Sequence, residues 1–137
     1  MTDLSNQQTL SVIQTANSFD SSYELARTIA EAADERKGSE IVLLKVGDVT
    51  VIADYFVVVT GYSKVQVRAI ARSIEDTVEE KLGRRPLRSE GFSESTWILE
   101  DYGDVIVHVL MPQEREYYDL EAFWGHAERT EFSPSQA

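Results

Sequence analysis

The residues best suited to chemistry are the carboxylates of Asp101 and Asp104, around a predicted turn, and the imidazole of His108. Carboxylates and imidazoles hold divalent metal ions and move protons. A metal site needs two or three ligands at fixed spacing, but the only other histidine, His126, follows the last predicted helix. We therefore expect no metal and no cofactor, and we expect His108 to be partly buried and satisfied by a hydrogen bond.

A second group with chemical potential is Gly61-Tyr62-Ser63, which lies between a predicted strand and a predicted helix. Backbone N–H groups at such a turn can bind an anion, and nucleotidyltransferases combine a Gly-Ser pair there with two metal-binding carboxylates on a later strand. Here Tyr62 separates the glycine from the serine, and no carboxylate pair with that spacing follows on a strand. We interpret Ser63 as a helix N-cap and expect no catalysis. The alternative is a nucleotide- or phosphate-binding enzyme that uses Gly61, Ser63 and the carboxylates of Asp101 and Asp104.

Apolar periodicity and turn residues predict the elements that must position these groups. Strands are predicted at 41–46, 54–60 and 87–91, and as a hairpin over 96–109. Helices are predicted between Ser22 and Gly38, from Ser63 to Leu82, and over 115–125. Both serines are suited to cap the helices that follow them, and Gly83 is suited to end the long helix.

This order predicts one compact α/β domain over residues 23–126, with a mixed β-sheet flanked by helices. At 137 residues the chain is long enough to bury a core without disulfides or metals. Residues 1–22 are rich in Gln, Ser, Thr and Asn, and residues 127–137 are mostly polar. We expect both segments to be flexible tails.

The face of the hairpin that carries Trp97 depends on the length of the turn. A two-residue loop at Tyr102-Gly103 puts Trp97 directly opposite His108, on one face with Leu99 and Ile106. A three-residue loop that ends at Gly103 shifts the parity by one, so that Trp97 joins the valines of the second strand. Tyrosine disfavours the positive φ of the shorter loop, and both arrangements remain open.

The last predicted helix carries more aromatic side chains than one buried face can hold. Four of its residues fall on one helical stripe, a pattern more typical of core than of interface: Tyr117, Leu120, Phe123 and Trp124. Arg115, Tyr118 and Glu121 fall on other faces. A short terminal helix cannot bury aromatics all round, so at least one should be exposed beside Arg115, as interface anchors are.

The net charge of -11 is the strongest compositional signal. Such a chain is repelled by phosphate backbones, so we expect little direct RNA contact. The acidity suits a basic protein surface as partner, or it serves solubility alone. The basic run 84–88 follows an acidic helix and balances its charge. The absence of cysteine, of a membrane-length apolar run and of signal-peptide features at the start predicts a cytoplasmic protein without a membrane partner.

Several segments resemble one known family when they are taken together and in order. They are Ala53-Asp54-Tyr55-Phe56-Val57, Thr60-Gly61-Tyr62-Ser63, Ala69-Ile70-Ala71, Glu90-Gly91, residues 97–108, Tyr118-Asp119-Leu120-Glu121 and Trp124-Gly125. The chain resembles the ribosomal silencing factor S family, also called the Iojap family, from about Tyr23 to Trp124. Members are similar to nucleotidyltransferases in fold but are not known as enzymes.

The resemblance implies a translational repressor that binds the large ribosomal subunit through ribosomal protein number fourteen and keeps the small subunit from joining. Its hairpin and last helix would dock on that partner. The candidate partner-binding residues are Trp97, Asp101, Tyr102, Asp104, His108, Arg115, Tyr118, Glu121 and Trp124. A homodimer through exposed apolar positions on the same elements is compatible with this function.

Overall fold

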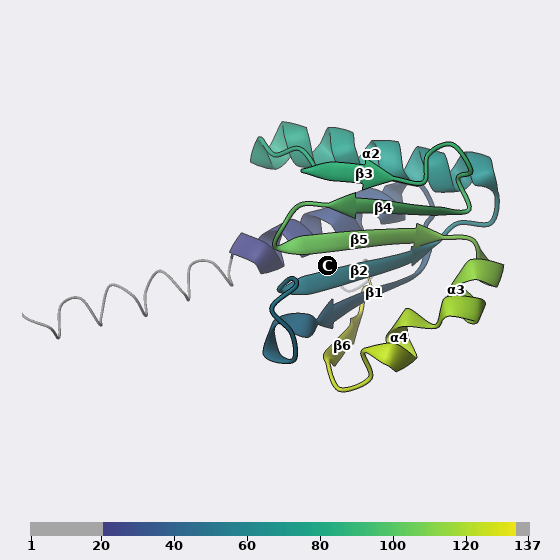
Figure 1. Cartoon of the computed structure of the whole chain (residues 1–137). Helices are drawn as coiled ribbons and strands as arrows, with labels where there is room; N and C mark the ends of the chain where they lie inside the picture. Colours follow the sequence, from purple (N-terminus) through teal and green to yellow (C-terminus); the bar gives the residue numbers. More distant parts are fainter. Residues whose placement is uncertain (1–20, 134–137) are drawn as a thin grey trace, which may run out of the picture.

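The computed structural model of the chain describes residues 21–133. They contain one six-stranded sheet with the strand order β3-β4-β5-β2-β1-β6 (Figure 1). The strands are β1 (Ser39–Lys45), β2 (Tyr55–Thr60), β3 (Arg88–Glu90), β4 (Trp97–Asp101), β5 (Val105–Leu110) and β6 (Glu128–Glu131). The central pair, β2 and β5, is parallel, and the other neighbouring pairs are antiparallel. The predicted α/β domain with a mixed sheet is confirmed.

Helices cover the two faces of this sheet unequally. The first helix, α1, is described over 21–35, and the long helix α2 spans Lys64–Leu82. Both pack on one face through fully buried aliphatic side chains. The opposite face, which we call the open face, carries a smaller buried cluster and lies under α3 (Pro112–Tyr118) and α4 (Leu120–Phe123) (Figure 1). Neither short helix contributes a buried residue, so the open face is the less protected one.

The two central strands read as continuous apolar runs because they are buried on both sides. In β2, Val57 and Val59 face α1 and α2, whereas Phe56 and Val58 face the open side. Every residue of β5 is buried, including His108. Strands enclosed in this way lose the polar alternation of a half-exposed strand.

Local capping signals position α2 as predicted. The Oγ of Ser63 accepts a hydrogen bond from the N–H of Gln66 at 3.0 Å, and Ser63 has an extended backbone, with φ of -149°. The helix ends at Gly83, where φ is +65° and the N–H donates to the carbonyl of Glu79. The predicted cap at Ser22 is wrong, because Ser22 lies within α1 and is buried. Tertiary contacts, described below, engage its hydroxyl instead.

The hairpin register settles which face carries Trp97. The two-residue connection is Gly103-Asp104, one position later than the shorter predicted loop, and the N–H of Tyr102 donates to the carbonyl of Val105. Glycine at position 103 adopts a φ of +94°, so no tyrosine has to take a positive φ. Trp97 lies opposite Leu110 rather than His108. Trp97 nevertheless shares the open face with His108, as the shorter loop predicted.

The C-terminal part of the domain differs from the prediction in two ways. The single helix predicted over 115–125 is broken at Asp119, which has a φ of +45° and caps α4 by accepting from the N–H of Ala122. The flexible tail predicted from residue 127 is wrong over 128–131, because β6 pairs with the outer edge of β1. This pairing satisfies backbone groups that would otherwise be free at a sheet edge. Within the predicted N-terminal tail, residues 1–20 lie outside the described residues.

Candidate partner-binding face

Seven ring-bearing side chains form a continuous series across the open face, in which each ring lies beside the next. The separations between successive ring centroids are between 4.7 and 5.8 Å. We call this set the aromatic series; in order of contact it consists of Tyr117, Tyr118, Trp97, His108, Phe56, Trp124 and Phe123. Pairs at such distances contribute more than burial of their area alone. The series therefore joins α3 and α4 to the central strands.

The middle of the aromatic series is buried, and its two ends are exposed. His108 and Phe56 come from β5 and β2 and are covered. Tyr117, Tyr118 and Phe123 come from the short helices, and they expose 80%, 52% and 77% of their surface. Large aromatic side chains held by neighbouring rings, with one side facing solvent, are typical anchors of protein interfaces.

Trp97 is held in place by a hydrogen bond as well as by ring contacts. Its indole Nε1 donates to Nδ1 of His108 at 3.1 Å. This bond requires a neutral imidazole with its proton on Nε2. Burial lowers the pKa of His108 to about 4, so the neutral form is the one present near neutral pH. His108 thus orients Trp97 from below, and Trp97 in turn supports Tyr118 at a centroid distance of 4.7 Å.

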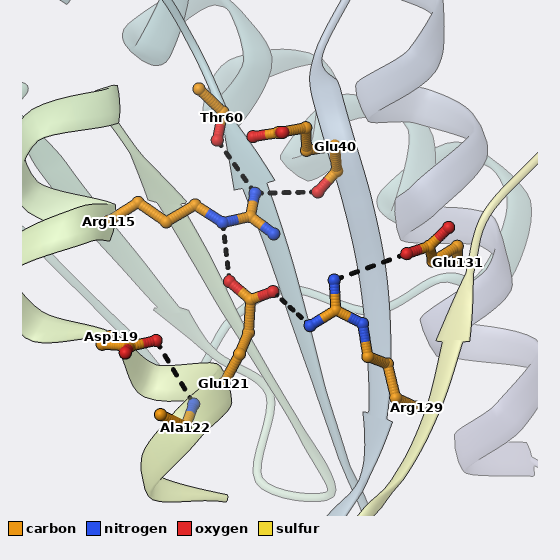
Figure 2. A network of polar contacts seen from close by, with 8 residues as sticks. All are labelled: Glu40, Thr60, Arg115, Asp119, Glu121, Ala122, Arg129 and Glu131. Carbon is orange, nitrogen blue, oxygen red and sulfur yellow. Dashed lines mark hydrogen bonds and ion pairs between the residues drawn. The ribbon is translucent and has the colours of Figure 1, made fainter. Parts of the chain in front are cut away.

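A network of charged side chains connects α3 and α4 to strands β1, β2 and β6 (Figure 2). Arg115 of α3 donates through Nε to Oε1 of Glu121 at 2.8 Å. Its Nη1 lies 2.9 Å from Oγ1 of Thr60 and 2.7 Å from the carbonyl oxygen of Glu40. Arg129 of β6 reaches the other carboxylate oxygen of Glu121 at 2.6 Å. The network borders a cavity of about 600 Å³ between β1, β6 and α3.

Three predicted site residues lie away from this face. Asp101, Tyr102 and Asp104 lie at the hairpin turn, at the opposite end of β5 from α3 (Figure 1). The six residues of β5 span about 20 Å at 3.3 Å per residue. Tyr102 is only 2% exposed and belongs to the core beneath α1 and α2, so its burial gives no support to the predicted partner contact.

The two carboxylates of this turn are engaged in building it. Arg84 donates to both oxygens of Asp104, at 3.2 and 2.8 Å, and to the carbonyl of Tyr102. Ser22 Oγ lies 2.9 Å from Asp104 and 2.6 Å from Asp54, so these carboxylates share one hydroxyl. Burial opposes the ionisation of Asp104, but the bonds from Arg84 and Ser22 outweigh it and hold its pKa below the ordinary value.

Asp101 has a similar local role. Its Oδ1 accepts from the N–H of Gly103 at 2.8 Å, and its Oδ2 lies 3.5 Å from Nε of Arg88. At Gly61-Tyr62-Ser63, the turn considered for anion binding, the N–H of Tyr62 donates a hydrogen bond to the side-chain oxygen of Gln66. Within residues 21–133, no three histidine, cysteine or acidic side chains are grouped so as to hold a metal ion. The catalytic interpretation therefore gains no support from this geometry.

Comparison with known proteins decides the family. Residues 19–137 match the family described as "Ribosomal silencing factor during starvation". The chain belongs to this family. The ribosomal silencing factor RsfS of Bacillus subtilis is 42% identical over 103 residues, which cover 75% of this chain and 86% of that protein. A crystal structure of a Chromobacterium violaceum protein superposes with a TM-score of 0.73 at 39% identity, over 75% of this chain and 85% of that one.

A more distant relative carries a name that bears on the ribosome. The Mus musculus protein named "Mitochondrial assembly of ribosomal large subunit protein 1" is 29% identical to this chain over 73 residues. These residues are 52% of this chain and 32% of that protein. The predicted resemblance to the ribosomal silencing factors is confirmed by these matches, and the chain is a member of a family of translational regulators. Across the described residues, no helix is long and apolar enough to cross a membrane.

The structure brings together six of the nine residues predicted for the silencing factor's binding site. Trp97, His108, Tyr118 and Trp124 belong to the aromatic series, and Arg115 and Glu121 form the adjoining network. Sequence reasoning missed Phe56, which joins His108 to Trp124, because an aromatic in an apolar strand reads only as core. It also missed Arg129, because no local sequence pattern predicts that Arg129 pairs with Glu121, eight residues earlier in the chain.

Proposed function

We propose that this silencing factor docks on the large ribosomal subunit through ribosomal protein number fourteen and thereby keeps the small subunit from joining. The observation that carries the proposal is the exposure of Tyr117, Tyr118 and Phe123 beside the half-buried Trp97. Exposed aromatics anchored on a rigid sheet are the side chains that contribute most to a protein interface.

The charge of the chain suits such a partner. Helix α3, which carries Tyr117 and Tyr118, also carries the half-buried Glu114 and the exposed Glu116, and the chain as a whole has a net charge of -11. An acidic rim attracts a basic ribosomal protein and raises the association rate, while it disfavours broad contact with rRNA. The name of the mouse relative, which refers to the large ribosomal subunit, supports the choice of subunit.

The mechanism we propose is steric and requires no chemistry. The aromatic series binds the ribosomal protein, and the body of the domain then occupies space that the small subunit needs. The polar groups considered for catalysis have structural roles: Ser63 caps α2, and Asp104 binds Arg84 and Ser22. We propose that it acts on ribosomes in the cytoplasm.

Co-sedimentation tests this proposal directly. Purified protein is mixed with isolated large subunits, isolated small subunits and joined ribosomes, and then separated by centrifugation. We expect binding to large subunits alone and fewer joined particles as protein is added. Binding to purified ribosomal protein number fourteen, measured separately, tests the choice of partner. Absence from every ribosomal fraction would refute the proposal.

A homodimer through the same face is a second state that the exposed aromatics support. Two copies joined there would cover Tyr117, Tyr118 and Phe123, and the dimer would then compete with the ribosomal protein. Light scattering on wild-type protein and on the Tyr118→Ala variant measures this. We expect any dimer to dissociate in the variant if the two surfaces coincide.

A further inference from the structure

The segment that presents the aromatics is attached to the sheet with little apolar burial. Among the residues that the structure describes, none from 111 to 133 is buried. Its apolar attachments are partly buried: Met111 and Phe132 pack against the core beneath α1 and α2, and Trp124 and Ala127 pack against the cluster of the open face. Tyr118, which is 52% exposed, lies beside Trp97. Segments with few buried contacts open locally at low free-energy cost. The position of α3 and α4 therefore depends on their polar attachments as well as on these few apolar contacts.

Those polar attachments form one chain of contacts that passes through Glu121. One carboxylate oxygen of Glu121 accepts from Arg115, and the other accepts from Arg129 (Figure 2). Arg115 continues the chain to Thr60 of β2 and to the backbone of Glu40 in β1. The chain thus connects α3, α4 and three strands. We call it the Arg129–Glu121–Arg115 relay.

The middle of this relay is shielded from solvent. The side chains of Arg115 and Glu121 are only 10% and 16% exposed, whereas that of Arg129 is 45% exposed. Burial opposes the ionisation of Glu121, but its bond to Arg115 and the charges of both arginines hold its pKa below the ordinary value. Charge-assisted hydrogen bonds at such sites are stronger than exposed ion pairs and less sensitive to salt.

We propose that Arg129 is a positioning residue for the partner-binding helices. It holds Glu121 from the β6 side, so that Glu121 presents its second oxygen to Arg115 and keeps α3 and α4 against the sheet. Arg129 acts through Glu121 and does not itself touch the aromatic series. This inference rests on the proposed function, because it assumes that the face carried by these helices binds the partner.

The first test is hydrogen exchange of the backbone amides of residues 112–124 in the free protein. Arg129→Gln removes one end of the relay, and we expect those amides to exchange about threefold faster. Glu131→Gln is the matched control, because Glu131 is the other ion-pair partner of Arg129, at 3.5 Å, and lies outside the relay. We expect exchange in this control to stay at the wild-type rate.

The second test is a double-mutant cycle. We expect Glu121→Gln to accelerate exchange about tenfold, because it releases Arg115 as well as Arg129. Adding Arg129→Gln to that variant should change nothing further. Additive effects would mean that Arg129 acts independently of Glu121, and they would overturn the relay.

Binding to ribosomal protein number fourteen separates this inference from the proposed function. Faster exchange together with weaker binding of Arg129→Gln supports both. Faster exchange with unchanged binding retains the relay and counts against the proposed binding face. Weaker binding with unchanged exchange would show that Arg129 contacts the partner directly, and it would overturn the positioning role, as would unchanged exchange and binding.

Discussion

The indole Nε1 of Trp97 donates a hydrogen bond to Nδ1 of His108, 3.1 Å away, and this bond connects β4 to β5 on the open face. Within the described residues, Nε2 of His108 has no hydrogen-bond partner. Burial opposes the charge of an imidazolium, and protonation of Nδ1 would also remove the acceptor that Trp97 uses, so the folded state strongly disfavours the charged form. One histidine therefore links the order of the open face to pH.

The contribution of His108 to the stability of the domain should fall below pH 6.5. Its pKa is about 4 in the folded state and 6.5 ordinarily, so the unfolded chain binds the proton more readily. The resulting stabilisation is complete above pH 6.5 and is lost as pH falls toward 4, by about 1.4 kcal/mol per pH unit. Because Glu100 acts in the opposite direction over the same range, the loss is measured as the difference in unfolding free energy between wild type and a variant without His108, at pH 7 and at pH 4.5.

His108→Asn is the matched variant for this measurement. The asparagine oxygen can accept from Trp97 in place of Nδ1 but does not titrate. We expect the variant to gain stability relative to wild type as pH falls from 6.5 to 4.5, because only wild type loses the His108 contribution there. Equal slopes in the two proteins would exclude His108 as the source.

Glu100 should give a pH dependence of the opposite sign. It is fully buried and accepts from Ser89, and burial, with the Glu75 carboxylate nearby, raises its pKa to about 7 from 4.5. Its neutral form is stabilising below pH 4.5, and this contribution is lost as pH rises to 7, by about 1.4 kcal/mol per pH unit.

Glu100→Gln should therefore be more stable than wild type at pH 8 and similar to it at pH 4.5. Urea unfolding at the two pH values measures the difference. Glu90→Gln is the control, because Glu90 lies on neighbouring β3 and is exposed. If wild type and Glu100→Gln differ equally at both pH values, the ionisation of Glu100 is not the cause.

Tyr118 should be an anchor for the ribosomal partner. We expect Tyr118→Ala to weaken binding to the large subunit by about 2 kcal/mol, or roughly thirtyfold in Kd, because an exposed ring held by Trp97 is lost. Equilibrium binding measures the change. Tyr23→Ala is the matched control: Tyr23 is 45% exposed and also contacts another ring, that of Tyr55, but it lies on α1 behind the sheet. Comparable affinities of the two variants would refute this assignment.

Asp104 should matter for folding rather than for binding. Asp104→Asn removes the charge that Arg84 and Ser22 contact, and we expect a loss of about 1 kcal/mol in unfolding free energy, because the site is partly exposed. Affinity for the large subunit should remain at the wild-type value. An affinity loss as large as that of Tyr118→Ala would contradict this prediction and would show that the hairpin turn contributes to binding.

Local sequence signals determined most of the secondary structure. The N-cap at Ser63, the left-handed C-cap at Gly83 and the two apolar runs of β1 and β2 act through neighbours in the chain, so they could be read directly. The hairpin was recognisable for the same reason. The resemblance carried by these ordered segments also identified the family, which fold periodicity alone does not reveal.

Tertiary structure decided the features that depend on distant parts of the chain. The strand period of two left the face of Trp97 open until the position of Gly103 set the register. Polar residues 128–131 form β6 only because β1 offers an unpaired edge. Tyr102 is core and Tyr118 is exposed because α1 and α2 cover one face of the sheet, while α3 and α4 lie on the other and contain no buried residue of their own. Exposure depends on what packs above a side chain, and residue type and spacing do not contain that information.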